Sequence, residues 1–146
     1  MPQPTPVPHA PTAQYVVDRF HADVVQQVAE AVASHDVVVV GMAWNPFVPK
    51  ARRFLDQAEI PHHDLDFGNY LSGWKQRLAL KIWANWPTFP MVFVKGTLVG
   101  GASDTKRALG DGSFKELLET GSVDPSRRAA VDEASKAAQA DGVPAT

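Results

Sequence analysis

The chain has 146 residues, of which 45% are hydrophobic, and a formal net charge of −2, as expected for one globular domain. The slightly acidic balance and the lack of a long basic run argue against nucleic acid or an anionic membrane as a partner. The sequence contains no cysteine, which excludes disulfides, thiolate metal ligands and cysteine nucleophiles.

The sequence also predicts no membrane segment. No apolar run approaches the roughly 18 residues needed to span a bilayer. The N-terminus lacks the basic and apolar regions of a secretion signal. We therefore expect a cytoplasmic protein.

The N-terminal residues 1–14 contain five prolines and almost nothing that could fill a core. They predict a disordered, extended arm, or alternatively a ligand for a proline-binding domain. From Tyr15 the pattern changes, because Val17, Phe20, Val24 and Val28 recur at helical spacing. An amphipathic helix is expected from Tyr15 to about residue 32.

A strand, a helix and a second strand are expected next. The run "HDVVVVG" is typical of a central strand buried on both faces. Asn45 and Pro46 then favour an N-cap and a first helical residue, for a helix ending near Glu59. "IPHHDLDFG" alternates as a half-buried strand does, which places the adjacent His62 and His63 on opposite faces. These histidines cannot chelate together, so no metal site is expected.

The second half of the domain predicts a helix, a hairpin and two short helices. A helix is expected from about Tyr70 to Trp83, and "WPTFP" ends it. "MVFV" and "TLVGG" around the Lys95-Gly96 turn predict a β-hairpin. Short helices follow, with Ser103 as the expected cap of the first and Gly121 ending the second. The helix from Tyr70 to Trp83 presents Leu71, Trp74, Leu78 and Ile82 on one apolar face, and Trp74 is expected to be a core or wall residue.

The alanine-rich residues 122–146 predict at most a marginal helix, because an alanine face buries little apolar area. The domain is therefore expected over residues 15–121. Its order of elements implies an α/β fold with a four-stranded mixed sheet flanked by helices.

Three segments resemble the glutaredoxin family of the thioredoxin fold. "WNPFVPKARRFL" is similar to the segment in which glutaredoxins carry Cys-Pro-Tyr-Cys or Cys-Gly-Phe-Ser, with Asn45 in the nucleophile position and Val48 in the second position. "NWPTFPMVFVKG" resembles the "WPTFPQ" run of monothiol glutaredoxins. "LVGGASDTKRAL" resembles the "GGxxD" helix start. Met42 and Phe47 depart from the family pattern, which usually has lysine and tyrosine there.

The resemblance implies a groove for glutathione. Pro90 is expected to be cis and to expose the Phe89 backbone for pairing with the ligand, with a trans edge-strand proline as the alternative. Arg77 and Lys81 are expected at the glycine carboxylate, or as an ordinary solvated face. The expected ligand-binding residues are Asn45, Phe47, Arg77, Lys81, Phe89, Pro90, Gly101, Ser103 and Asp104.

An asparagine cannot do the chemistry of the cysteine it replaces. An amide has no thiolate and no redox chemistry, so Asn45 serves either as a helix cap only or as part of a site that binds without reacting. We interpret the chain as a redox-inactive binding module for glutathione, a γ-glutamyl or peptide ligand, or a protein partner, with no catalytic residue. Two alternatives stay open: a glutathione-dependent transferase using the cosubstrate's own thiol, and a structural or regulatory subunit with a vestigial groove. No iron–sulfur cluster is expected, because the chain supplies no thiolate.

Overall fold

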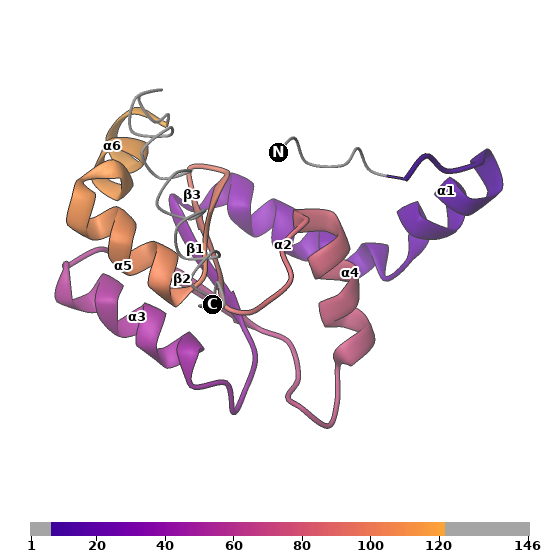
Figure 1. Cartoon of the computed structure of the whole chain (residues 1–146), viewed down its shortest axis with the longest axis horizontal. Coiled ribbons are helices and arrows are strands. Elements are labelled where there is room, and N and C mark those ends of the chain that lie inside the picture. The colour runs from indigo at the N-terminus through magenta and orange to yellow at the C-terminus, as the bar shows by residue number, and fades with distance from the viewer. Residues whose placement is uncertain (1–6, 122–146) are drawn as a thin grey trace, which may run out of the picture.

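The computed structural model describes residues 7–121, which form one mixed four-stranded sheet covered by helices (Figure 1). The elements are α1 (Pro11–Arg19), α2 (Ala22–Ser34), β1 (Val37–Gly41), α3 (Phe47–Gln57), β2 (His63–Asp66), α4 (Trp74–Ala84), β3 (Met91–Val94), β4 (Thr97–Gly100), α5 (Ala102–Asp111) and α6 (Ser113–Thr120). None of these helices is both long and apolar enough to cross a bilayer.

The strand order is β2-β1-β3-β4, with β1 parallel to β2 and antiparallel to β3. β3 and β4 form the predicted hairpin. All residues of β1 are buried, as the run of β-branched residues predicts for a central strand. The predicted α/β fold is confirmed.

The sheet separates two cores, because successive residues of a strand point to opposite faces. Val38 and Val40 face α2 and α4. Val37 and Val39 face α3, α5 and α6, which lie on the other side of the sheet (Figure 1). The alternation continues in β3, so the helices of both faces are held by the same two central strands.

The N-terminal region differs from the sequence prediction. α1 begins at Pro11, inside the predicted arm, and has no buried residue. The expected continuous helix from Tyr15 is wrong, because His21 has φ 46 and separates α1 from α2. No glycine or proline marks this break in the sequence, so helical spacing alone could not reveal it. Residues 1–6 of the predicted arm and the whole tail 122–146 lie outside the described residues.

The start of α4 also differs from the prediction. The Asn69 side chain accepts hydrogen bonds from the N–H groups of Leu71 and Ser72, at 2.8 and 3.1 Å. This local turn competes with the helix, which begins only at Trp74 after Gly73 at φ 77. The predicted apolar face of Leu71, Trp74, Leu78 and Ile82 is exposed. Arg77, Ala79 and Leu80 are buried instead.

Two leucines of α4 test this orientation. Leu80 is 0% exposed and Leu78 is 39% exposed, so we expect Leu80→Ala to lower the free energy of unfolding by about 2–5 kcal/mol. The matched Leu78→Ala variant is expected to lower it by less than about 1 kcal/mol. Urea unfolding of both variants measures the difference. Equal losses would show that α4 presents another face to the core.

Candidate functional site

Three segments that are distant in sequence meet at one end of the sheet. Val40 of β1 pairs with Met91 of β3, so the loop after β1 lies beside Pro90. Val92 pairs with Gly100, so the start of α5 lies on the other side of the same proline. The loop before α4 joins them, because the Ala43 N–H donates to the Gly68 carbonyl at 2.9 Å. Sheet register therefore brings together the three segments that carry the resemblance.

Asn45 links two of these segments through its side chain. Its Oδ1 accepts a hydrogen bond from the Phe47 N–H at 2.8 Å, which satisfies a free donor of the first turn of α3. Its Nδ2 donates to the Phe89 carbonyl at 3.2 Å. The ordered helix begins at Phe47 with Pro46 at the cap position, one residue later than predicted. Asn45 nevertheless caps α3 and also holds the segment before β3.

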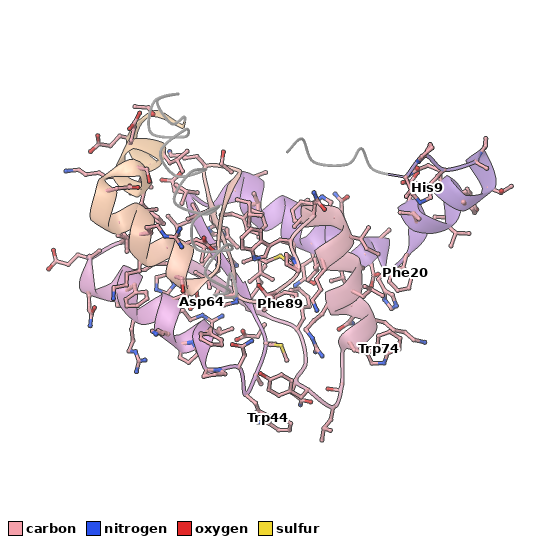
Figure 2. The ribbon with its side chains drawn as sticks, in the orientation of Figure 1. His9, Phe20, Trp44, Asp64, Trp74 and Phe89 are labelled. Atoms are coloured by element: carbon pink, nitrogen blue, oxygen red, sulfur yellow. The ribbon has the colours of Figure 1, made fainter. Side chains whose placement is uncertain are left out.

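The segment before β3 is largely buried. The Phe89–Pro90 peptide bond is cis, and the Phe89 side chain is 4% exposed. Figure 2 shows Phe89 inside the molecule. The Lys81 Nζ lies 5.8 Å from the centroid of the Phe89 ring, which places one predicted basic residue at the site. Among the described residues, none accepts a hydrogen bond from the Phe89 N–H.

The start of α5 is capped by Asp104 rather than by the predicted Ser103. The Asp104 Oδ2 accepts a hydrogen bond from the Gly101 N–H at 3.0 Å, and the helix begins at Ala102. Ser103 is exposed in the first turn. Gly100 has φ 125, and a Cβ there would lie 2.6 Å from the Asp104 Oδ2. Only glycine permits this approach, so the cap explains the glycine at position 100.

Arg77 does not lie on the surface expected for a ligand contact. Its side chain is buried, with Nη1 donating to the carbonyls of Phe67 at 3.1 Å and Ser72 at 2.6 Å. Arg77 therefore holds the loop before α4, and only Lys81 of the predicted basic pair faces the site.

The two adjacent histidines have different partners, and only His63 lies in β2. His62 Nδ1 lies 2.6 Å from Asp64 Oδ1, and its Nε2 lies 2.8 Å from Asp56 Oδ1. His63 instead stacks on His35, with ring centroids 4.0 Å apart. Over residues 7–121, no group of three or more His, Asp or Glu side chains is arranged to hold a metal ion.

Burial lowers the pKa of His62, but hydrogen bonds and charge interactions with Asp56 and Asp64 outweigh it and raise the pKa above 6.5. The charged imidazolium is therefore favoured in the folded protein.

Sequence reasoning missed the aromatic side chains exposed around the site. Trp44 has φ 67 and lies exposed in the loop before α3, at the edge of the molecule (Figure 2). Tyr70 and Trp74 are exposed in the neighbouring loop and at the start of α4. We expected Trp74 in a core or wall position, and this is wrong. Their exposure follows from loop conformations that no periodic pattern reports.

Known proteins similar to this chain share its fold and most of its length. A glutaredoxin-like protein of Dictyostelium discoideum is 42% identical over 102 residues, which cover 69% of this chain and 83% of that protein. This chain belongs to the glutaredoxin family. The chloroplastic glutaredoxin-C4 of rice is 32% identical over 95 residues, covering 64% of this chain and 71% of that protein. No family model matches the sequence.

Solved glutaredoxins have the same fold. Oxidized glutaredoxin 2 from Chlamydomonas reinhardtii superimposes with a TM-score of 0.59 at 27% identity, over 67% of this chain and 92% of that one. A buckwheat glutaredoxin–glutathione complex superimposes with a TM-score of 0.61 at 22% identity, over 70% and 94% of the two chains. The present chain is thus a glutaredoxin-like protein that contains no cysteine.

Arg77 offers a test of its role. We expect Arg77→Met to lower the free energy of unfolding by about 2–4 kcal/mol, because two carbonyls lose their donor inside the protein. Arg53→Met, an exposed arginine of α3, should change it by less than about 0.5 kcal/mol. Urea unfolding measures both. Unchanged stability of Arg77→Met would show that these two hydrogen bonds do not stabilise the fold, and Arg77 would again be a candidate ligand contact.

His62 makes stability depend on pH. Because its pKa is raised in the folded state, its contribution is fully present below the unfolded value of 6.5 and is lost as pH rises through the folded value. We therefore expect the unfolding free energy to fall as pH rises above 6.5 and through the raised folded-state pKa. His62→Asn should flatten this decline, whereas His9→Asn, at an exposed position, should keep it. A decline that persists in His62→Asn would exclude His62 as its source.

Proposed function

We propose that this glutaredoxin-like protein is a non-redox binding module for glutathione or a related γ-glutamyl peptide. The single observation that carries the proposal is the Asn45 side chain. It joins the start of α3 to the Phe89 carbonyl, at the position where the family motif resembled here has its cysteine. The chain has no cysteine elsewhere, so no protein thiol remains for disulfide exchange.

The candidate site has the groups that a small peptide ligand needs. The free Phe89 N–H is a donor for an extended ligand backbone, and its carbonyl can accept a second hydrogen bond beside that of Asn45. Lys81 near the Phe89 ring can pair with a ligand carboxylate. At the start of α5, Ser103 lies where a helix N-terminus favours an anion, and the Asp104 carboxylate can accept from an ammonium group. Arg77 is left out of this set.

The solved buckwheat glutaredoxin–glutathione complex supports the same ligand class, since it has the fold of this chain. The donor set does not fit an iron–sulfur cluster. Such clusters are held by thiolates, and two external glutathiones cannot complete four-thiolate coordination without a protein cysteine. A glutathione or peptide groove is therefore the ligand site that these residues favour.

The geometry favours binding over a transferase reaction. A transferase of this kind would need donors aimed at the cosubstrate thiolate. The Asn45 amide uses its oxygen and one of its two N–H groups within the protein, Pro46 has no N–H, and the Phe47 N–H donates to Asn45. The first turn of α3 thus has few donors left to stabilise a thiolate.

Titration with glutathione tests the proposal. In two-dimensional NMR, we expect reduced glutathione to shift the amide signals of Phe89, Lys81 and Ser103 at concentrations up to about 10 mM. S-methylglutathione should bind equally well, because the site makes no use of the thiol. Lys81→Gln should lower the affinity for both ligands by about fivefold, and Lys75→Gln on the same helix should leave both affinities unchanged.

Two results would contradict the proposal. Unchanged spectra at about 10 mM of either ligand would remove the glutathione site. A strong preference for the free thiol over its methyl ether would instead favour the transferase.

A further inference from the structure

A second candidate site lies in the groove between α3 and α5, which run side by side on one face of the sheet (Figure 1). The groove is open to solvent and has a volume of about 600 Å³. Lys50 and Phe54 line it from α3, and Ser103, Lys106 and Arg107 line it from α5. This volume lies in the range of small-molecule sites, roughly 300–1,000 Å³.

The lining is positively charged although the chain as a whole is not. Lys50, Lys106 and Arg107 contribute three cationic side chains, against one carboxylate from Asp111. That carboxylate accepts a hydrogen bond from the Ser113 N–H at 2.8 Å. The formal net charge of the whole chain is −2, so cations are concentrated here. Such a site attracts an anion.

These cations are only weakly compensated within the protein. Over residues 7–121, Lys50 and Lys106 form no ion pair, and Arg107 Nη2 lies 3.8 Å from Asp104 Oδ1 with its side chain 39% exposed. An exposed pair at this distance contributes little and leaves Arg107 able to contact another anion.

The groove also has an aromatic wall. The Phe54 ring is half-buried, and the Lys106 Nζ lies 5.8 Å from its centroid. A flat ring can stack on Phe54 while its anionic group meets the cations. Charge and aromatic wall together select a ligand that carries both a phosphate and a planar ring.

We propose that the α3–α5 groove binds a small organic phosphate with a planar ring, of the nucleoside monophosphate class. Lys50, Lys106 and Arg107 contact the phosphate, and Phe54 contacts the ring. These four residues are separate from those of the proposed glutathione site, whereas Ser103 only lines the rim of the groove and is assigned to the glutathione site. The proposal does not depend on glutathione binding.

A comparison of the affinities of three simple probes tests whether the groove recognises both phosphate and ring. By calorimetry and two-dimensional NMR, we expect adenosine monophosphate to bind with at least about tenfold higher affinity than either adenosine or inorganic phosphate. The affinity should fall as salt is raised, because the recognised charges are partly exposed. Equal binding of adenosine and its monophosphate would overturn the proposal, as would no binding of any probe.

Variants locate the site. We expect the double variant Lys50→Gln/Lys106→Gln to lower the affinity for adenosine monophosphate by at least about tenfold. Lys115→Gln on α6 should leave this affinity unchanged. Gly110→Leu supplies a test that keeps every charge, because Gly110 lines the groove and a Cβ there would meet no atom within 4 Å. Its side chain should obstruct the groove and reduce binding without unfolding the protein.

Thermal unfolding of each variant confirms the fold. Full affinity in both the double variant and Gly110→Leu would place the phosphate elsewhere and overturn the proposal. S-methylglutathione at saturation should leave the affinity for adenosine monophosphate within about twofold, which separates this site from the glutathione groove. Mutual exclusion of the two ligands would show that they share one site, and would overturn the separate groove.

Discussion

Burial of β1 on both faces is the constraint on which the rest of the structure depends. Every residue from Val37 to Gly41 is buried, and the strand pairs with β2 on one side and β3 on the other. Alternate valines face opposite layers of helices, so this one strand belongs to both cores. Its register also determines which loops meet at the end of the sheet. The candidate site is therefore a consequence of how β1 pairs.

At that end of the sheet, a side chain without redox chemistry takes a structural position. Asn45 caps α3 through its oxygen and holds the Phe89 carbonyl through its nitrogen. A thiolate could not make both hydrogen bonds, because it has no donor. Asn45 thus serves as a link between two segments. Asp104 has a similar role at α5, where it caps the helix at the close approach of Gly100.

Much of the fold could be predicted because its signals are local and strong. A run of β-branched residues marks β1, and a lysine–glycine turn marks the hairpin of β3 and β4. The helix boundaries were less predictable, since weak local competitors decide them. The Asn69 turn delays α4, and the positive φ of His21 divides the N-terminal helix. Each of these local features contributes less free energy than the burial of the core, so it shifts a helix boundary without changing the overall fold.

The sequence by itself determined the α/β class, the central strand, the family resemblance and the absence of thiol chemistry, because composition and local pattern carry these features. Only the tertiary structure decided which charged side chains can meet a ligand. It buried Arg77 against two backbone carbonyls, left Lys81 beside Phe89, and aligned Lys50 with Lys106 across two helices. Sequence spacing reports one helix at a time, whereas burial and pairing depend on how the helices pack across the sheet.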